Sequence, residues 1–369
     1  MATRLRFGAS SAKVPALGVG KVPFPSMVPV PIVITPKPTD SLPKADIVVM
    51  MDTAAEWEAT ADVLSPGSGT ASWHPYTKNW AAFALQISPN APAAHSKKLG
   101  SYFLIQIGSK MLEGISPVPQ RVILYKTELH MHEDAKKLAD GTYSLPIKDM
   151  LKQIITDTQC KYFLTTGTSG GVYPSMSLGD VVVSRAAMFD CKKDFASAPF
   201  DNQTFKSDWT VPATHVTDAY TLMQSFASHL SGSKKLAPAT NCGCNAMVYP
   251  TNIYYDGAQT FDADFPNPIP AFHPILTTDY FEFGTTVNDL YKQGLAVEMD
   301  DACLGLACSE LANPPLWACV RNLSDPVIDG ALDEKTQGEC AEYFYTEYGY
   351  WTTVNSALVT WAICAGLSQ

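Results

Sequence analysis

The stretch Lys161–Ser184, KYFLTTGTSGGVYPSMSLGDVVVS, decides the fold, because two apolar runs flank a group of small polar residues. The apolar runs predict two buried strands. The Thr, Ser and Gly residues between them predict a turn that offers N–H and hydroxyl groups to a polar ligand. The alternative is that Gly167, Gly170 and Gly171 only turn a tight corner between two strands. Other segments have to decide between these interpretations.

Strand and helix patterns alternate on both sides of this stretch. A buried strand is expected at Asp46–Met51, followed by a helix over 54–64. The alternation predicts an α/β fold with three αβα layers, in which helices cover both faces of a mixed, mainly parallel sheet. Further strands are expected at 102–107, 121–125, 275–278, 295–299 and 316–320, and further helices at 147–156, 218–230, 301–311 and 339–367.

The domain organisation is predicted to be one catalytic domain, residues 45–369, with two additions. Residues 1–44 contain a Pro-punctuated apolar segment without the uninterrupted apolar core of a secretory signal. We interpret them as an extended arm lying over the domain or over a partner subunit. From about 190 to 274 the periodicity degrades, which indicates a long insertion on the same domain.

Composition excludes several classes of partner. The net charge is -10, with 26 Lys and Arg against 36 Asp and Glu, so no overall basic field exists to hold a nucleic-acid polymer. The apolar stretches are broken before the roughly 18 to 20 residues that a membrane span needs. The nine cysteines include no paired Cys-x-x-Cys frame, so no metal site is expected.

The sequence contains signals for both a cytoplasmic and a secreted protein. Cys303, Cys308 and Cys319 fall in apolar segments, which favours reduced, buried thiols in a cytoplasmic enzyme. Glycosylation sequons at 202–204 (NQT) and 322–324 (NLS) are instead typical of a secreted protein.

Polar clusters follow several of the predicted strands, at the strand ends where open α/β sheets bind ligands. Capping would explain Asp300 and Asp301 as part of a helix start, and residues 324–326 would suit an ordinary turn. Charges directly after several hydrophobic strands are harder to explain, because buried strand ends rarely carry unpaired charge. The clusters are Glu56 with Glu58, Thr168-Ser169-Gly170-Gly171, Glu298-Met299-Asp300-Asp301 and Arg321-Asn322-Leu323-Ser324-Asp325.

These clusters resemble the motifs of one superfamily, which contains purine nucleoside phosphorylase, uridine phosphorylase and methylthioadenosine/S-adenosylhomocysteine nucleosidase. Its GT/S-x-GG loop with a following lGDvvv resembles 166–183, its vEME segment resembles 297–300, and its R-x-iSD resembles 321–325. The order and approximate spacing agree over roughly 46–367, with the insertion set aside. The resemblance implies a nucleoside phosphorylase-like fold that, as a homo-oligomer without a cofactor, cleaves the N-glycosidic bond of a small purine-type nucleoside.

The resemblance also implies roles for individual residues. Asp325 would be the general acid that protonates the purine N7, which suits a carboxyl tuned toward the operating pH. Met299 would pack under the ribose, with Glu298 and Asp300 near the sugar hydroxyls. The family usually has Glu where this chain has Asp300, so one methylene is missing.

The other binding residues implied by the resemblance surround the same pocket. Phe281 would stack on the base or sugar, although a core aromatic is an equal alternative. Arg321 would orient Asp325 or anchor its loop, with a structural ion pair as the alternative. The set is completed by Thr168, Ser169, Gly170 and Ser324, which would line the side of the sugar and the attacking group.

The sequence favours water over phosphate as the attacking group. Residues 51–64 contain no Arg or Lys for a bidentate phosphate clamp. Where the family's second Arg is expected, the segment 125–137 offers Lys126, His130 and His132 and lacks the usual glycines. The nucleosidases place a Glu after the first strand to activate water, and Glu56 holds that position, with Glu58 as the reserve. A phosphorylase with phosphate as co-substrate is the first alternative. A non-catalytic nucleoside-binding or storage protein is the second, since fold does not fix function.

Overall fold

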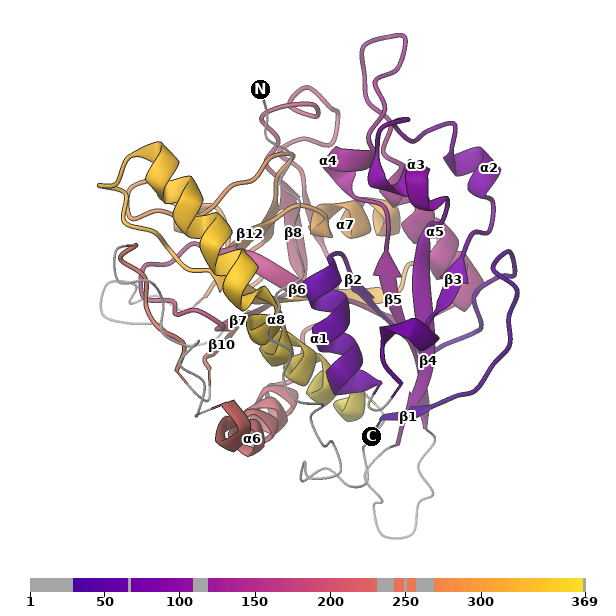
Figure 1. Ribbon diagram of the computed structural model, residues 1–369, viewed down its shortest axis with the longest axis horizontal. Helices are drawn as coiled ribbons and strands as arrows, with labels where there is room; N and C mark the ends of the chain where they lie inside the picture. The colour runs from indigo at the N-terminus through magenta and orange to yellow at the C-terminus, as the bar shows by residue number, and fades with distance from the viewer. Residues whose placement is uncertain are drawn as a thin grey trace.

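The computed structural model describes residues 29–65, 68–108, 119–230, 242–248, 251–256 and 269–367. A 13-stranded sheet carries helices on both of its faces (Figure 1). The strands are β1 (Pro29–Pro31), β2 (Ile47–Met51), β3 (His74–Tyr76), β4 (Gly100–Ile107), β5 (Gln120–Thr127), β6 (Tyr162–Gly171), β7 (Val181–Ser184), β8 (Ala186–Phe189), β9 (Thr204–Lys206), β10 (Ile253–Tyr255), β11 (Ile275–Thr277), β12 (Ala296–Glu298) and β13 (Leu316–Asp325). The helices are α1 (Ala54–Leu64), η2 (Thr70–Ser72), α2 (Trp80–Phe83), α3 (Pro92–Ser96), α4 (Met131–Asp134), α5 (Pro146–Thr158), α6 (Ala213–Leu230), η4 (Leu290–Lys292), α7 (Asp301–Ser309) and α8 (Glu334–Gly366).

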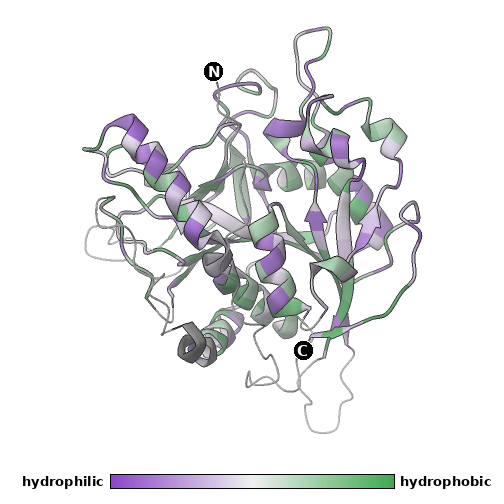
Figure 2. Ribbon diagram, viewed as in Figure 1, coloured by the Kyte–Doolittle hydropathy of each residue, from purple (hydrophilic) through white to green (hydrophobic). Residues whose placement is uncertain are grey.

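The three layers follow from side-chain alternation along strands that are buried on both faces. In β2, Val48 and Met50 join the apolar core beneath α5 and α7. Ile47, Val49 and Met51 point the other way, into the core beneath α1, α6 and α8. Figure 2 shows the mixed apolar and polar colouring of the covering helices α1 and α8. Burial on both faces explains why the strand is a continuous apolar run and not an alternating one.

The sheet is mixed, as expected. Its main strand order is β1-β4-β5-β2-β6-β12-β11-β8-β9. Outside this order, β13 pairs with β6 and with β7, β10 pairs with β7, and β3 pairs with β4. The central strands β5, β2, β6 and β13 run parallel, whereas β4 and β12 are antiparallel to their inner neighbours. The carboxyl ends of the four parallel strands therefore meet at one edge, where ligands bind in such sheets.

The small-residue stretch is a strand and not a turn, so that prediction was wrong. Residues 165–170 pair with β13 on one side, and Gly170 and Gly171 also pair with β12 on the other. The turn follows later, at 173–180. Small residues adopt extended backbone readily where neighbouring strands complete their hydrogen bonds, and this tertiary pairing outweighs their turn preference.

The predicted additions are described only in part. Residues 1–28 of the arm lie outside the described residues, while β1 pairs with the edge of β4. Within the predicted insertion, the described elements β9, α6 and β10 join the same sheet and helix layers. The domain boundaries stay predictions. In the described ranges no helix has the length and apolar character that crossing a bilayer requires.

The structure bears on both signals about the compartment. Cys303, Cys308 and Cys319 are free and buried, as expected, whereas Cys242 and Cys340 form a disulfide. The sequon at Asn322 lies inside β13, where the side chain is fully buried and donates to Thr352 Oγ1 at 2.8 Å. A buried asparagine cannot carry a glycan, whereas Asn202 is exposed.

Candidate active site

A gap in strand pairing creates the site. On one edge of β6, strand β2 pairs with residues 162–165 and strand β12 with residues 170–171. Neither pairing includes 166–169, so the segments that follow β2 and β12 converge on this short length of β6. Those segments carry the acidic residues that the sequence singled out.

Glu56 lies at the start of α1 and reaches across to β6. Thr53 caps the helix, and Glu56 Oε2 accepts from the backbone N–H groups of Asp52 (2.7 Å) and Thr53 (2.8 Å). This is a capping box, in which a glutamate at the third helical position reaches back to the helix start. Glu56 Oε1 accepts from Thr168 N–H (2.8 Å) and Thr168 Oγ1 (2.6 Å). Glu58 lies two positions further along the helix and therefore on another face.

Gly167 is required for this arrangement. Its φ of +155° lies in a region that side chains rarely adopt, and a β-carbon there would lie 2.4 Å from Glu56 Cδ. The glycine therefore makes room for the carboxylate beside the strand.

Asp325 ends β13 and faces the other end of the small-residue stretch. A β-carbon on Gly170 would lie 2.8 Å from Asp325 Oδ2, so that glycine admits the carboxyl. Ser324 Oγ donates to Asp325 Oδ1 at 2.7 Å. Burial raises the pKa of Asp325 to about 7, and the bond from Ser324 opposes the rise. The group is therefore an acid that holds or releases its proton near neutral pH.

Arg321 is the centre of a buried ion cluster. Its Nε donates to Asp301 Oδ2 at 2.9 Å, and a guanidinium NH2 group also bonds the other Asp301 oxygen. The same group pairs with Asp52 at 3.0 Å and lies 3.4 Å from a Glu298 oxygen. Burial raises the pKa of Glu298 well above its usual range, Asp301 adds to the rise, and Arg321 opposes it. These contacts match the structural ion pair, and the described contacts include none from Arg321 to Asp325.

Replacing Arg321 with Met is expected to lower the free energy of unfolding by about 3–5 kcal/mol, because buried carboxylates lose their counter-charge. Urea unfolding followed by circular dichroism measures the loss. Lys335→Met is the matched control: its pair with Glu339 is exposed, and such surface changes stay within about 0.5 kcal/mol. A similarly small loss for Arg321→Met would contradict the structural role of the cluster.

Asp300 and Glu298 also have partners within the protein. Asp300 Oδ2 lies 3.0 Å from His130 Nδ1, and its Oδ1 accepts from Met131 N–H at 2.7 Å. Burial lowers the pKa of His130, but the hydrogen bond to Asp300 and the negative charges of Asp300 and Asp52 together outweigh burial, so the net pKa is about 10. Glu298 accepts from Thr277 Oγ1 (2.5 Å) and from the N–H groups that open α7. The Glu298 carboxylate therefore caps the start of α7, and its predicted contact with the sugar hydroxyls stays a prediction.

The remaining predicted residues lie on β6 and on the segments that follow β11 and β12. Ser169 is buried, and its Oγ donates to the Asn322 carbonyl at 3.2 Å. Phe281 is half-buried beside Phe283, with ring centroids 5.9 Å apart, so its exposed part remains available for stacking. Met299 is also half-buried.

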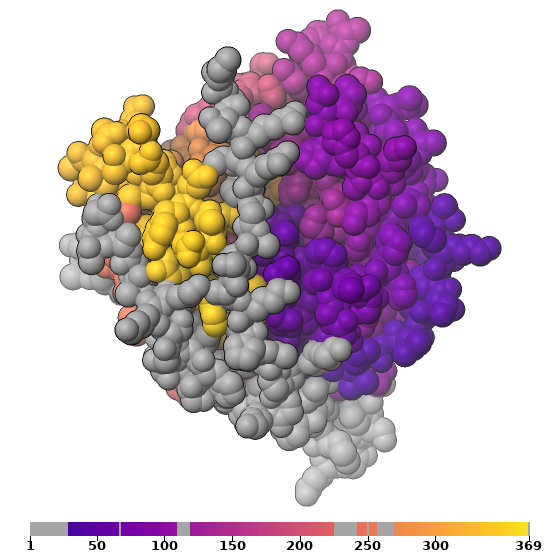
Figure 3. Space-filling view, viewed as in Figure 1, coloured from indigo at the N-terminus to yellow at the C-terminus, as the bar shows by residue number. Residues whose placement is uncertain are grey.

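Sequence reasoning missed Tyr345 on α8. Burial raises its pKa, and nearby Glu56 and Asp325 raise it further, so the phenol lies within electrostatic range of both carboxyls. The aromatic richness of the terminal helix was the only signal, and it does not say which ring faces the site. On the face of the molecule that Figure 3 shows, α8 lies in yellow on the left and elements of the first half of the chain lie on the right.

A separate hollow of about 380 Å³ lies away from this site, between α5, α7 and the loop before β9. Its lining includes Leu145, Phe200 and Leu306, with Lys148 and Glu310 paired at 2.8 Å. It contains none of the strand-end carboxyls, so we place the chemistry at Asp325 and Glu56.

Comparisons with protein-family models and with curated proteins find no match. Solved nucleosidase structures are similar to the chain. The Neisseria meningitidis 5'-methylthioadenosine/S-adenosylhomocysteine nucleosidase, in complex with methylthio-immucillin-A, has a TM-score of 0.45 and 14% identity over 87% of this chain and 99% of that one. For the Helicobacter pylori futalosine hydrolase the TM-score is 0.43, with 11% identity over 86% and 96% of the two chains. For the Colwellia psychrerythraea nucleosidase with adenine the values are 0.37 and 15%, over 85% and 96%.

These proteins are of the kind that the sequence motifs resemble.

Proposed function

We propose that this protein cleaves the N-glycosidic bond of a purine-type nucleoside by hydrolysis. The observation that carries the proposal is Asp325, a buried carboxyl at a strand end with a pKa raised to about 7. A carboxyl in this state donates a proton near neutral pH, as a general acid must. Glu56, with Thr168 of β6 beside it, would supply the polar groups for the attacking side.

The reaction follows from the two carboxyls. Asp325 gives its proton to N7 of the purine, and the bond between C1' and N9 breaks as its electrons enter the base. Water adds to C1' of the resulting cation, and its proton passes to Glu56. The products are the free base and the free sugar, and exchange with solvent restores both carboxyls.

The charges of the described residues support water rather than phosphate as the attacking group. Lys126 pairs with Glu128 at 3.3 Å, and His130 pairs with Asp300 at 3.0 Å. Arg321 is enclosed by its own carboxylates, so these cations are already neutralised by neighbours. A phosphate dianion would also meet Glu56, and like charges at close range repel.

A nucleoside-binding protein without turnover is a second candidate, which the hydrogen bonding of Glu56 favours. A carboxylate offers about four lone-pair sites, and Glu56 accepts four hydrogen bonds. Water can bind to Glu56 Oε1 only when the Thr168 hydroxyl rotates away from it. Catalysis therefore requires this hydroxyl to rotate, whereas binding does not.

Release of free base from adenosine, inosine and guanosine, followed by chromatography with and without inorganic phosphate, tests the proposal. We expect equal release in both conditions together with free ribose. Release that needs phosphate, with ribose 1-phosphate as product, would establish the phosphorylase instead. Binding without release would establish the binding protein.

A further inference from the structure

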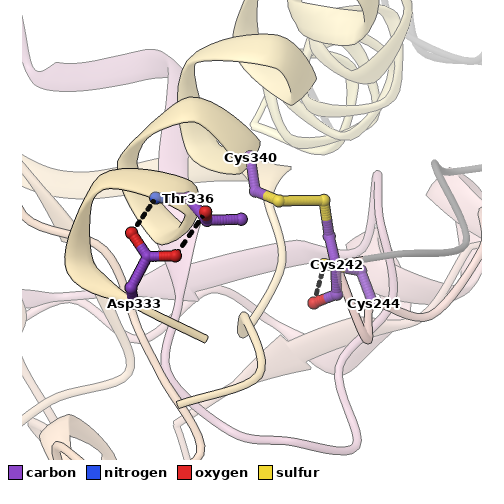
Figure 4. The surroundings of a disulfide bond; sticks show 5 residues. All are labelled: Cys242, Cys244, Asp333, Thr336 and Cys340. Carbon is purple, nitrogen blue, oxygen red and sulfur yellow. Dashed lines mark hydrogen bonds between the residues drawn. A yellow bond between two sulfur atoms is a disulfide. The ribbon is translucent and has the colours of Figure 1, made fainter. Parts of the chain in front are cut away.

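A short disulfide-tied loop, residues 242–248, lies beside the candidate acid. The Cys242–Cys340 disulfide joins this loop to α8 across 98 residues of sequence (Figure 4). The Cys242 carbonyl accepts from Asp329 N–H at 3.1 Å, four residues beyond Asp325. The loop is thereby attached both to α8 and to the segment between β13 and α8.

The other end of this loop is attached to the segment that follows β6. Leu178 N–H donates to the Asn245 carbonyl at 3.1 Å, and Asn245 Nδ2 donates to the Pro174 carbonyl at 3.1 Å. The loop thus bridges the continuations of the two strands that carry Gly170 and Asp325. Its position is set by covalent and backbone bonds, which hold it more firmly than surface side chains would.

Cys244 lies two residues beyond the disulfide in this loop. It packs in the apolar cluster that also contains Phe281, Phe283 and Leu332. Burial raises the pKa of the Cys244 thiol to about 12, and the Asp325 carboxylate contributes, so the two groups lie within electrostatic range. Cys244 is also partly exposed, whereas the other free cysteines are buried.

The surroundings of Asp325 therefore have four sides. Gly170 of β6 forms one, since a β-carbon there would lie 3.6 Å from Phe283 Cα and 2.8 Å from the acid. Phe283 and its neighbour Phe281 form the second, α8 with Tyr345 the third, and the loop with Cys244 the fourth. The disulfide connects the third side to the fourth.

We propose that loop 242–248 is a wall of the purine subsite and that Cys244 is the residue of this wall that contacts the leaving base. The inference rests on the proposed function for the identity of the ligand. A flat purine suits surroundings with aromatic rings on one side and a soft, polarizable sulfur on another. A thiol that stays protonated at neutral pH adds no charge that would compete with Asp325 for the base.

Alkylation tests this placement without relying on turnover. The native protein is treated with iodoacetamide in a mildly alkaline buffer, where the thiol proton is lost to solvent and the minor thiolate form of Cys244 displaces iodide. Labelled peptides are quantified by mass spectrometry with adenine, hypoxanthine or guanine present. A base at ten times its Kd leaves about one protein in eleven unliganded, so labelling of Cys244 should slow about tenfold. Uracil at the same concentration is the control ligand, and Cys244→Ser gives the background.

A variant tests the same contact by affinity. Cys244→Trp would fill the subsite, and we expect the Kd for the purine to rise at least about tenfold, whereas Cys244→Ser keeps it within a factor of about three. Calorimetry measures both, and near-ultraviolet circular dichroism confirms that each variant is folded.

The outcomes separate this inference from the proposed function. Cleavage with no protection of Cys244 by a bound base would overturn the inference alone. Protection by a purine without cleavage would support the inference and overturn the hydrolysis. If none of the three purines binds and no nucleoside is cleaved, both are wrong.

Discussion

Replacing Asp325 with Asn is expected to slow base release about a hundredfold to ten-thousandfold, the range that one general acid contributes. The amide matches the carboxyl in size and still accepts the hydrogen bond from Ser324 Oγ, but it has no proton to give to the purine. Single-turnover release of base from the best nucleoside measures the effect. The variant should fold, because the amide removes a charge whose burial is unfavourable, as the raised pKa shows.

Asp333→Asn is the matched control for this substitution. Asp333 caps α8 through the Thr336 N–H at 3.1 Å, and Asn caps a helix as well as Asp does. Its activity should equal that of the unchanged protein. Retained cleavage in Asp325→Asn would rule out Asp325 as the acid.

The pH dependence follows from the same group. The active form of Asp325 is protonated, and its pKa is raised from 3.8 to about 7 by burial. The active form is therefore fully present well below pH 7 and is lost as the pH rises through 7. We expect kcat/KM to fall about tenfold for each pH unit above that value.

The residual activity of Asp325→Asn should not show this fall between pH 6 and 8.5. Asp52 is the competing assignment, because burial raises its pKa to about 7 as well, against the effect of Arg321. A fall that persists in Asp325→Asn would assign the titration to Asp52.

Replacing Glu56 with Gln is expected to have the second largest effect, a loss of about a hundredfold to ten-thousandfold in hydrolysis. Gln satisfies the capping box at this helix position, so α1 keeps its start. The amide does not accept a proton from water, so attack on C1' slows while binding of the base persists. The measurement combines the rate of base release with the Kd for the purine by calorimetry.

Glu58→Gln is the matched control two positions along the same helix. Its activity should be unchanged, because Glu58 lies on a different face of α1 from Glu56. Loss of activity in Glu58→Gln with retention in Glu56→Gln would exchange the two assignments. Equal activity in all three proteins would remove α1 from the mechanism.

The sequence predicted the elements well where the pattern is local. The apolar run at β2, the helix of α7 and the strand at β12 appear within a few residues of the expected bounds. Apolar periodicity records which face of an element is buried, and that information is carried by neighbouring residues. Polar clusters at strand ends were visible for the same reason, and the structure brings Glu56 against Thr168 and Asp325 against Gly170.

Only the tertiary structure decided what each of these groups contacts. The small-residue stretch became a strand because β13 and β12 complete its hydrogen bonds, which no local pattern reveals. Arg321 pairs with Asp52, and Asp300 with His130, although the partners are distant in sequence.

The terminal helix and the disulfide are further features whose contacts only the tertiary structure shows. Tyr345 and Cys244 lie within electrostatic range of Asp325, on segments whose sequences carry no motif, and the Cys242–Cys340 disulfide joins these two segments. By itself, the sequence determined the layers, the strand ends and the acidic residues found there, because buried faces require apolar residues at regular intervals along the chain. Pairing, protonation and the walls of the pocket depend on through-space distance, and only the folded chain sets those distances.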